Sequence, residues 1–168
     1  VGATRIFDDN TGFDISRCDN DFVKLIERSY ANGARISSNS WGCAGCNASY
    51  DVTSQIYDVA TRDAQLSDSG NQELIFIIAA GNTGPNASTI NTPANAKNVI
   101  TVGGSENTRP TWEDGCGMTA THANNAMDMA IFSSRGPAPG GRVKPEIVAP
   151  ATHIQGTAST HPNYTGYQ

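Results

Sequence analysis

The residue whose position most clearly allows chemistry is Asn82. It lies between Gly81 and Gly84 and follows seven consecutive apolar residues, 74–80. An apolar run that ends at such a turn is typical of a strand buried on both faces of a parallel sheet. Because ligands bind beyond the carboxyl ends of these strands, the Asn82 amide is well placed to meet a substrate. The alternative is a turn asparagine that satisfies nearby backbone groups.

Cysteines are the second group that could carry chemistry. The four of them, Cys18, Cys43, Cys46 and Cys116, could pair in three ways or form one tetrahedral metal site. Only one Cys-x-x-Cys unit is present, whereas a zinc ribbon needs two. We therefore favour disulfides, with free buried thiols as the remaining interpretation, and expect an extracellular or secreted protein.

The composition excludes several classes of protein. With a net charge of −5 and no basic stripe, the chain is not expected to bind nucleic acid. No apolar run reaches the roughly 18 residues that a membrane span needs, and the N-terminus lacks the pattern of a signal peptide. The chain opens on Val1 without an initiator Met, so we expect an excised or processed piece of a longer protein.

Local patterns predict the elements that position these residues. Helices are expected over about 20–32 and from the cap candidate Asp51 to about residue 69. The alternation of strands and helices favours right-handed crossovers and a parallel sheet in a single domain. Strands are expected at 4–9, 34–42, 74–80 and 99–104, with a long loop over 82–98, a surface excursion over 105–130, and short extended segments in 132–137 and 144–150.

Five blocks of this sequence resemble, in family order, those of the subtilisin-like serine peptidases. Each block is weak alone, but five in order are specific. The resemblance implies an α/β fold with a parallel-sheet, three-layer (helix/sheet/helix) subtilisin-like core, present here in part as a single partial catalytic domain over residues 1–168. The blocks are Asn39-Ser40-Trp41-Gly42, residues 79–84 (Ala-Ala-Gly-Asn-Thr-Gly), residues 99–103 (Val-Ile-Thr-Val-Gly), residues 132–137 (Phe-Ser-Ser-Arg-Gly-Pro) and residues 144–150 (Lys-Pro-Glu-Ile-Val-Ala-Pro).

The same resemblance points to what is missing. The family hydrolyses peptide bonds with an Asp, a His and a Ser, and none of the three blocks that carry them stands at its family position here. His122, His153 and His161 lie downstream of where the catalytic His would be, so they are expected to be surface histidines. Residues 156–162 resemble the serine block with alanine as nucleophile, but they follow Pro150 too closely and no apolar helix comes after them. The segment alone is therefore predicted to be inactive, although its parent resembles a serine endopeptidase.

The resemblance assigns roles to the residues that are present. Asn82 is similar to the oxyanion-hole asparagine of the family, whose amide stabilises the charge that develops on the scissile carbonyl. The stretch Ser40-Trp41-Gly42 resembles the strand that pairs with the substrate, with Trp41 covering a side-chain pocket. A core aromatic at a strand end is the alternative for Trp41. The facing pocket wall would be Ala79-Ala80-Gly81, whose small side chains favour larger apolar substrate residues.

Further features concern structure around that cleft. Thr92-Pro93 matches a position where the family has a cis peptide bond. The carbonyls of Ala94, Ala96 and Val99 fall where family members can hold a weak calcium or sodium ion, although no cofactor is required for the chemistry. In two departures, Glu146 stands where Asp is commoner, and Ala151 replaces the usual Gly, so its backbone must avoid glycine-only angles or carry strain.

Two other functional classes are alternatives to the peptidase segment. A non-catalytic relative that binds peptides or acts as a scaffold would also lack the nucleophile. A dinucleotide-binding protein needs Gly-x-Gly-x-x-Gly after a strand, which residues 81–84 do not supply. The expected partners are a peptide or protein substrate and the remaining part of the catalytic domain. Apolar sheet edges left without that part favour self-association of the segment.

Overall fold

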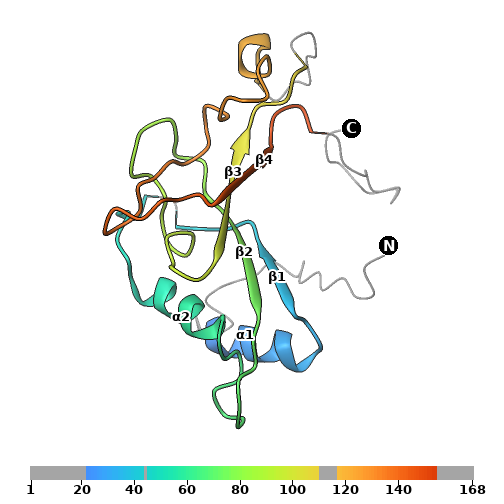
Figure 1. Ribbon diagram of the computed structural model, residues 1–168, viewed down its shortest axis with the longest axis vertical. Helices are drawn as coiled ribbons and strands as arrows, with labels where there is room; N and C mark the ends of the chain where they lie inside the picture. Colours follow the sequence, from blue (N-terminus) through green and yellow to red (C-terminus); the bar gives the residue numbers. More distant parts are fainter. Residues whose placement is uncertain (1–21, 44, 110–116, 155–168) are drawn as a thin grey trace.

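Four parallel strands form one sheet in the order β1-β2-β3-β4 (Figure 1). The computed structural model describes residues 22–43, 45–109 and 117–154, so the strand predicted at 4–9 lies outside the described residues. The elements are α1 (Phe22–Ala31), β1 (Ile36–Asn39), α2 (Val52–Ala60), β2 (Ile75–Ala79), β3 (Ile100–Ser105), a short 3-10 helix (Ala120–His122) and β4 (Ile147–Pro150). The predicted parallel α/β sheet is thus confirmed.

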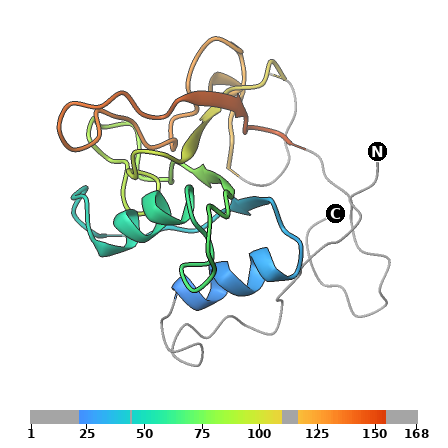
Figure 2. The same ribbon diagram turned by 60° about the horizontal axis from the view of Figure 1, so that its bottom comes forward.

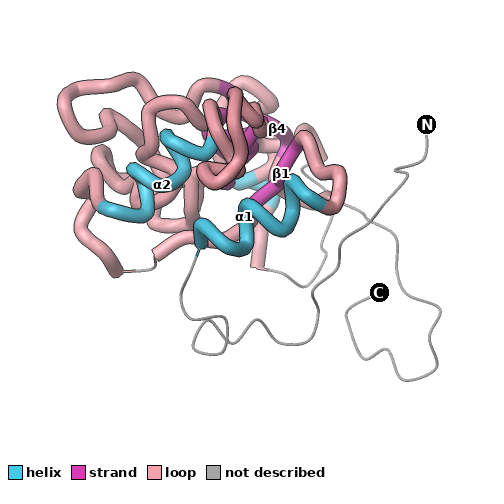
Figure 3. Tube along the Cα trace, turned by 90° about the horizontal axis from the view of Figure 1, so that it is seen from below, coloured by secondary structure: helices cyan, strands magenta, loops and turns pink. Residues whose placement is uncertain are grey.

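Sheet register decides which side chains share a face. Ile36 lies beside Ile75, and Ile77 lies beside Ile100. Because side chains alternate along a strand, these isoleucines point to one face, and Phe76 and Ile78 point to the other. The second face is covered by both helices, which lie side by side on the same side of the sheet (Figures 2 and 3).

The core lies between that covered face and the helices. Phe76 and Ile78 are buried, and the ring of Tyr57 from α2 meets Phe76 edge-on at 4.8 Å between centroids. Ile26 of α1 belongs to the same cluster. The strand that carries Asn82 at its end therefore rests on a packed layer of aromatic and aliphatic side chains.

The prediction that residues 74–80 are buried on both faces is wrong. Ile75 is 49% exposed, Ile36 is 60% exposed and Ile147 is 53% exposed. Their face of the sheet stays open because α1 and α2 both cover the opposite one. Among the described residues, the helices thus supply one of the two outer layers expected for a three-layer core.

Helix α2 ends about nine residues earlier than the periodicity predicts. It begins as expected at Asp51, whose carboxylate accepts the Ser54 backbone N–H at 3.0 Å. It ends at Ala60, and the Asp63 carboxylate then accepts the Gln65 N–H at 3.1 Å. Asp side chains that bond nearby backbone groups compete with helical hydrogen bonds, so the apolar period continues through turns rather than a helix.

One histidine expected at the surface is buried instead. His153 is 4% exposed and has a positive φ of 49°, and its carbonyl accepts Arg109 Nη1 at 3.3 Å. The neighbouring residue Thr152 holds this segment in the interior. Its hydroxyl accepts the N–H of Asn107, which follows β3 in the chain, at 2.8 Å. His122 is half-buried, and His161 lies outside the described residues.

Tyr57 makes the fold sensitive to alkali. Burial raises the pKa of its phenol well above the usual range. The phenol ionises above pH ~10 in the unfolded chain but stays neutral to higher pH in the folded protein. The free energy of unfolding should therefore be unchanged below pH ~10 and should fall by up to about 1.4 kcal/mol per pH unit above it. Tyr57→Phe is expected to reduce this slope in urea unfolding curves between pH 8 and 11. A wild-type slope no steeper than that of the variant would contradict the prediction.

Candidate active site

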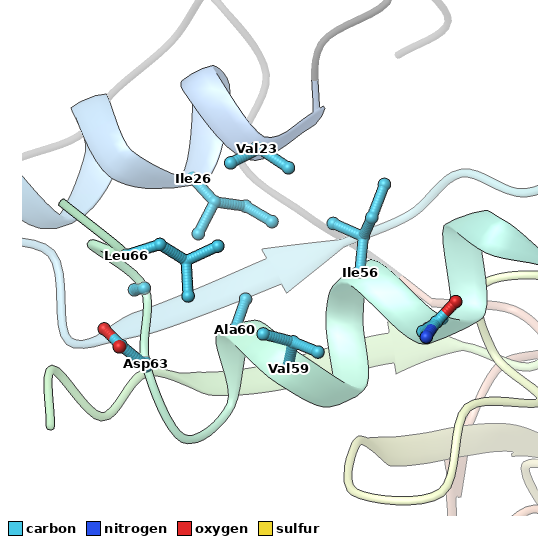
Figure 4. Close-up of a pocket in the computed structure, with 9 residues that line it drawn as sticks. Val23, Ile26, Ile56, Val59, Ala60, Asp63 and Leu66 are labelled. Carbon is cyan, nitrogen blue, oxygen red and sulfur yellow. The ribbon is translucent and has the colours of Figure 1, made fainter.

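Two of the hollows on the described surface are candidates for a binding site. The first lies between α1 and α2 and is lined mainly by apolar side chains, among them Val23, Ile56 and Leu66 (Figure 4). Asp63 and Gln55 are its polar lining residues. Catalytic pockets need several convergent polar groups, so this apolar hollow is the weaker candidate for chemistry.

The second hollow, which we call the strand-end hollow, encloses about 330 Å³ at the carboxyl ends of the strands. This is where ligands bind in open α/β sheets. Five of the predicted site residues line it together, namely Ser40, Ala79, Ala80, Gly81 and Asn82. The structure therefore places the amide, the pocket wall and the first residue of the predicted substrate strand around one space.

The turn that carries Asn82 is shaped by its two glycines. Gly81 has a φ of 103°, a left-handed conformation that residues with a side chain rarely adopt. A Cβ at Gly84 would collide with the Ser133 carbonyl, so glycine is required for the turn to lie on the segment 131–134. The Asn82 side chain is exposed at the mouth of the hollow.

Trp41 and Gly42 are not among the residues that line the hollow. The Trp41 ring stacks on Phe22 of α1 at 5.0 Å and 4°, and it tilts against Tyr57 at 6.0 Å. Its indole N–H donates to the Asn39 side chain at 3.2 Å. These contacts lie on the helix side of the sheet, which favours the alternative of a packing aromatic at a strand end.

A disulfide closes the loop that follows this strand. Cys43 and Cys46 are bonded, with 5.5 Å between their Cα atoms. The Cys43 N–H donates to the Thr92 carbonyl at 3.2 Å, and the Asn91 amide donates to the Cys43 carbonyl at 3.2 Å. The bridge thus closes a loop that hydrogen bonds already hold to Asn91 and Thr92. Cys18 and Cys116 lie outside the described residues.

Comparison with known protein families decides the relationship. The sequence model of the subtilase family matches residues 11–168. The chain belongs to the subtilase family. Its resemblance to this family in five sequence blocks, and the parallel α/β sheet that the resemblance implies, are both confirmed.

Curated subtilase relatives are much longer than this chain. It is 36% identical over 81 residues to the serine protease AprX of Bacillus subtilis (strain 168), a match that covers 48% of this chain and 16% of AprX. It is 34% identical over 90 residues to pyrolysin of Pyrococcus furiosus, covering 6% of pyrolysin. Among solved structures, sphericase has a TM-score of 0.49 at 24% identity, over 78% of this chain and 38% of sphericase. The S41 psychrophilic protease has a TM-score of 0.47 at 25% identity, covering 77% of this chain and 38% of that protein.

The loop over 82–98 has the cis peptide bond that the subtilase resemblance predicts, at Thr92–Pro93. The Thr92 hydroxyl donates to the Asp51 carboxylate at 2.7 Å, which joins this loop to the start of α2. Burial opposes ionisation of Asp51, but hydrogen bonds from Ser54 and Thr92 outweigh it, and its pKa is lowered. One carboxylate therefore caps α2 and also holds the loop that contains the cis peptide bond.

At the predicted cation position, protein groups donate to some of the carbonyl oxygens. The Ala94 carbonyl accepts the Thr101 hydroxyl at 2.6 Å, and the Val99 carbonyl accepts the Lys144 ammonium at 3.0 Å. Lys144 also forms an ion pair of 2.6 Å with Glu146. Two of the three carbonyls are thus engaged by protein donors, and an internal ammonium stands beside them. Groups of three or more His, Cys, Asp or Glu suited to a metal are absent from the part of the chain that the structure describes.

The two departures from the family pattern are accommodated by local contacts. Glu146 accepts the Thr101 N–H at 2.7 Å with one carboxylate oxygen while the other pairs with Lys144. Ala151 is not among the described non-glycine residues with positive φ, which are Ser88 and His153. The expectation that its backbone avoids glycine-only angles is therefore confirmed.

Sequence reasoning missed part of the strand-end hollow. Most of the missed lining residues come from β3, β4 and the segment 132–133, within blocks that carried the subtilase resemblance, and Gly104 and Ala151 lie one residue beyond such blocks. The blocks gave no sign that these residues line the same hollow as Asn82, because which face a strand presents depends on its register in the sheet. The missed residues include Gly103, Gly104, Phe132, Ser133, Ala149 and Ala151.

Proposed function

We propose that this chain is the part of a subtilisin-like serine endopeptidase that supplies the oxyanion-hole amide and one wall of the substrate cleft. The observation that carries the proposal is the position of Asn82 at the mouth of the strand-end hollow. Peptide hydrolysis develops negative charge on the scissile carbonyl oxygen, and a fixed neutral donor stabilises that charge. The polar amide, small pocket wall and strand ends suit an extended peptide substrate.

The chain on its own is proposed to be inactive. No Asp, His or Ser stands in the family's catalytic blocks within its sequence, so nucleophile and base must come from the remaining part of the catalytic domain. The open sheet face, with Ile36, Ile75 and Ile147 exposed, is the surface we assign to that part. Without it, the segment is expected to self-associate through this apolar face.

Secretion is part of the proposal. The Cys43–Cys46 disulfide supports it, since such bonds persist in oxidising surroundings. No helix among the described residues is long and apolar enough to cross a membrane. We assign no cofactor to the reaction and propose peptides or proteins, rather than nucleic acid, as its substrates.

The test compares the full-length protein with residues 1–168 alone. The full-length protein should hydrolyse fluorogenic peptides, prefer large apolar side chains before the cleaved bond, and react with a fluorophosphonate serine reagent. The 168-residue chain should show no hydrolysis and no reaction with the serine reagent. Hydrolysis by the short chain would disprove the assignment, whereas a full-length protein that binds peptides without cleaving them or reacting would identify the non-catalytic relative instead.

A further inference from the structure

The buried residue Ser134 bonds the backbone on both sides of Asn82. Its N–H donates to the Gly81 carbonyl at 2.9 Å, and its hydroxyl oxygen accepts the Thr83 N–H at 3.1 Å. Ser134 is fully buried, with an exposed fraction of 0%, and does not line the strand-end hollow. We propose that Ser134 is a positioning residue that aims the Asn82 amide, an inference that rests on the oxyanion role of Asn82.

The direction of the Asn82 amide depends on the backbone of the turn, because little else restrains this side chain. The side chain is exposed, and no hydrogen bond to its amide occurs within the described ranges. The direction of its Cα–Cβ bond is set by φ and ψ, which the two Ser134 bonds fix from either side. An oxyanion donor must lie about 2.7–3.1 Å from the developing charge, and a misplacement of about 1 Å can cost 10²-fold in rate.

The Ser134 hydroxyl is suited to holding the turn around Asn82, because it donates one hydrogen bond and accepts another at the same time. It lies 2.9 Å from the Thr83 hydroxyl, which donates to the Thr89 carbonyl at 3.1 Å. Because the Thr83 proton is directed to Thr89, Ser134 donates its own proton to the Thr83 oxygen. Its lone pair then accepts the Thr83 N–H. Alanine at this position would remove both bonds of the hydroxyl and leave the N–H without that acceptor.

Gly81 and Ser134 are matched in shape as well as in bonding. A Cβ at Gly81 would lie 2.9 Å from the Ser134 hydroxyl oxygen, closer than such contacts normally come. Glycine therefore leaves the space that the hydroxyl fills, and its φ of 103° turns the chain so that Asn82 faces the hollow. A further backbone hydrogen bond holds the end of the turn, since the Gly84 N–H donates to the Phe132 carbonyl at 2.9 Å.

A double-mutant cycle in the full-length peptidase tests the proposal. Ser134→Ala is expected to lower kcat by about 10-fold to 100-fold with KM nearly unchanged, because only the transition state uses the aimed amide. In the Asn82→Ala background the same substitution should change kcat less than about twofold, because no amide remains to be aimed. Equal losses in both backgrounds, or no loss in the wild type, would overturn the positioning role.

Controls separate aiming from general stability and from the function itself. Thr152→Val removes another fully buried hydroxyl that accepts a backbone N–H, that of Asn107, so it should lower the unfolding midpoint but not kcat. Ser134→Cys keeps a weak acceptor of similar size and should give an intermediate kcat if Ser134→Ala does not fold. If Asn82→Ala alone leaves kcat unchanged, the oxyanion role is refuted, and the positioning role is refuted with it. If Asn82→Ala lowers kcat but the loss caused by Ser134→Ala is the same with and without Asn82, only the positioning role is refuted.

Discussion

If the full-length protein is the proposed peptidase, replacing Asn82 by alanine is expected to lower its kcat by about 10²–10³-fold while KM changes little, a magnitude taken from the same kind of asparagine in a subtilisin. The physical reason is that the amide N–H donors stabilise charge that exists only in the transition state. Asn82 is exposed, and its removal leaves no buried group unpaired, so the fold should be unaffected. Steady-state kinetics with a fluorogenic peptide measure the loss.

A neighbouring asparagine provides the matched control. Asn86 is exposed in the same loop, and its recorded hydrogen bond uses its backbone carbonyl, which accepts the Thr89 hydroxyl at 3.0 Å. Asn86→Ala should therefore leave kcat and KM as they are. If Asn82→Ala retained the full kcat, or if it raised KM instead of lowering kcat, Asn82 would be a turn residue or a ground-state contact and not the oxyanion donor.

Lys144→Met is expected to reduce the free energy of unfolding by about 3 kcal/mol. The ammonium is buried, with 2% of its side chain exposed, and bonds the Val99 carbonyl and the Thr101 hydroxyl at 3.0 Å each. Burial lowers its pKa, and the Glu146 carboxylate opposes that shift. Methionine keeps the apolar stem but leaves these oxygens without their donor. Because the Glu146 side chain is 38% exposed, water can solvate it and limit the loss.

Equilibrium unfolding in urea measures this change, with Lys97→Met as the control. Lys97 is exposed, its ammonium lies over the Tyr50 ring at 4.4 Å, and its loss should cost less than about 1 kcal/mol. Adding Glu146→Gln to Lys144→Met should recover part of the stability, since the unpaired carboxylate is removed. Calcium and chelators should leave the wild-type midpoint unchanged. A midpoint that rises with calcium would show that a cation, and not Lys144, holds this loop.

Local sequence determined the elements and the residue at the end of the central strand. The apolar spacing from Phe22 and the closing Gly33 predict α1, and the run before Gly81 predicts β2, because the type of an element and its caps depend mainly on consecutive residues. The same reasoning placed Asp51 at the start of α2. The family blocks then predicted that Asn82 lies beside a substrate cleft, since their order along the chain is specific even where each is weak.

Only the tertiary structure decided which residues that are far apart in the sequence contact one another. Thr83 and Ser134 are 51 positions apart and Val99 and Lys144 are 45 apart, and no local period records either contact. The sequence likewise did not predict on which side of the sheet Trp41 packs, because that depends on its contact with Phe22 of α1. Residues fix local conformation through their own backbone preferences. Contacts between distant segments exist only once the sheet register and crossovers bring those segments together.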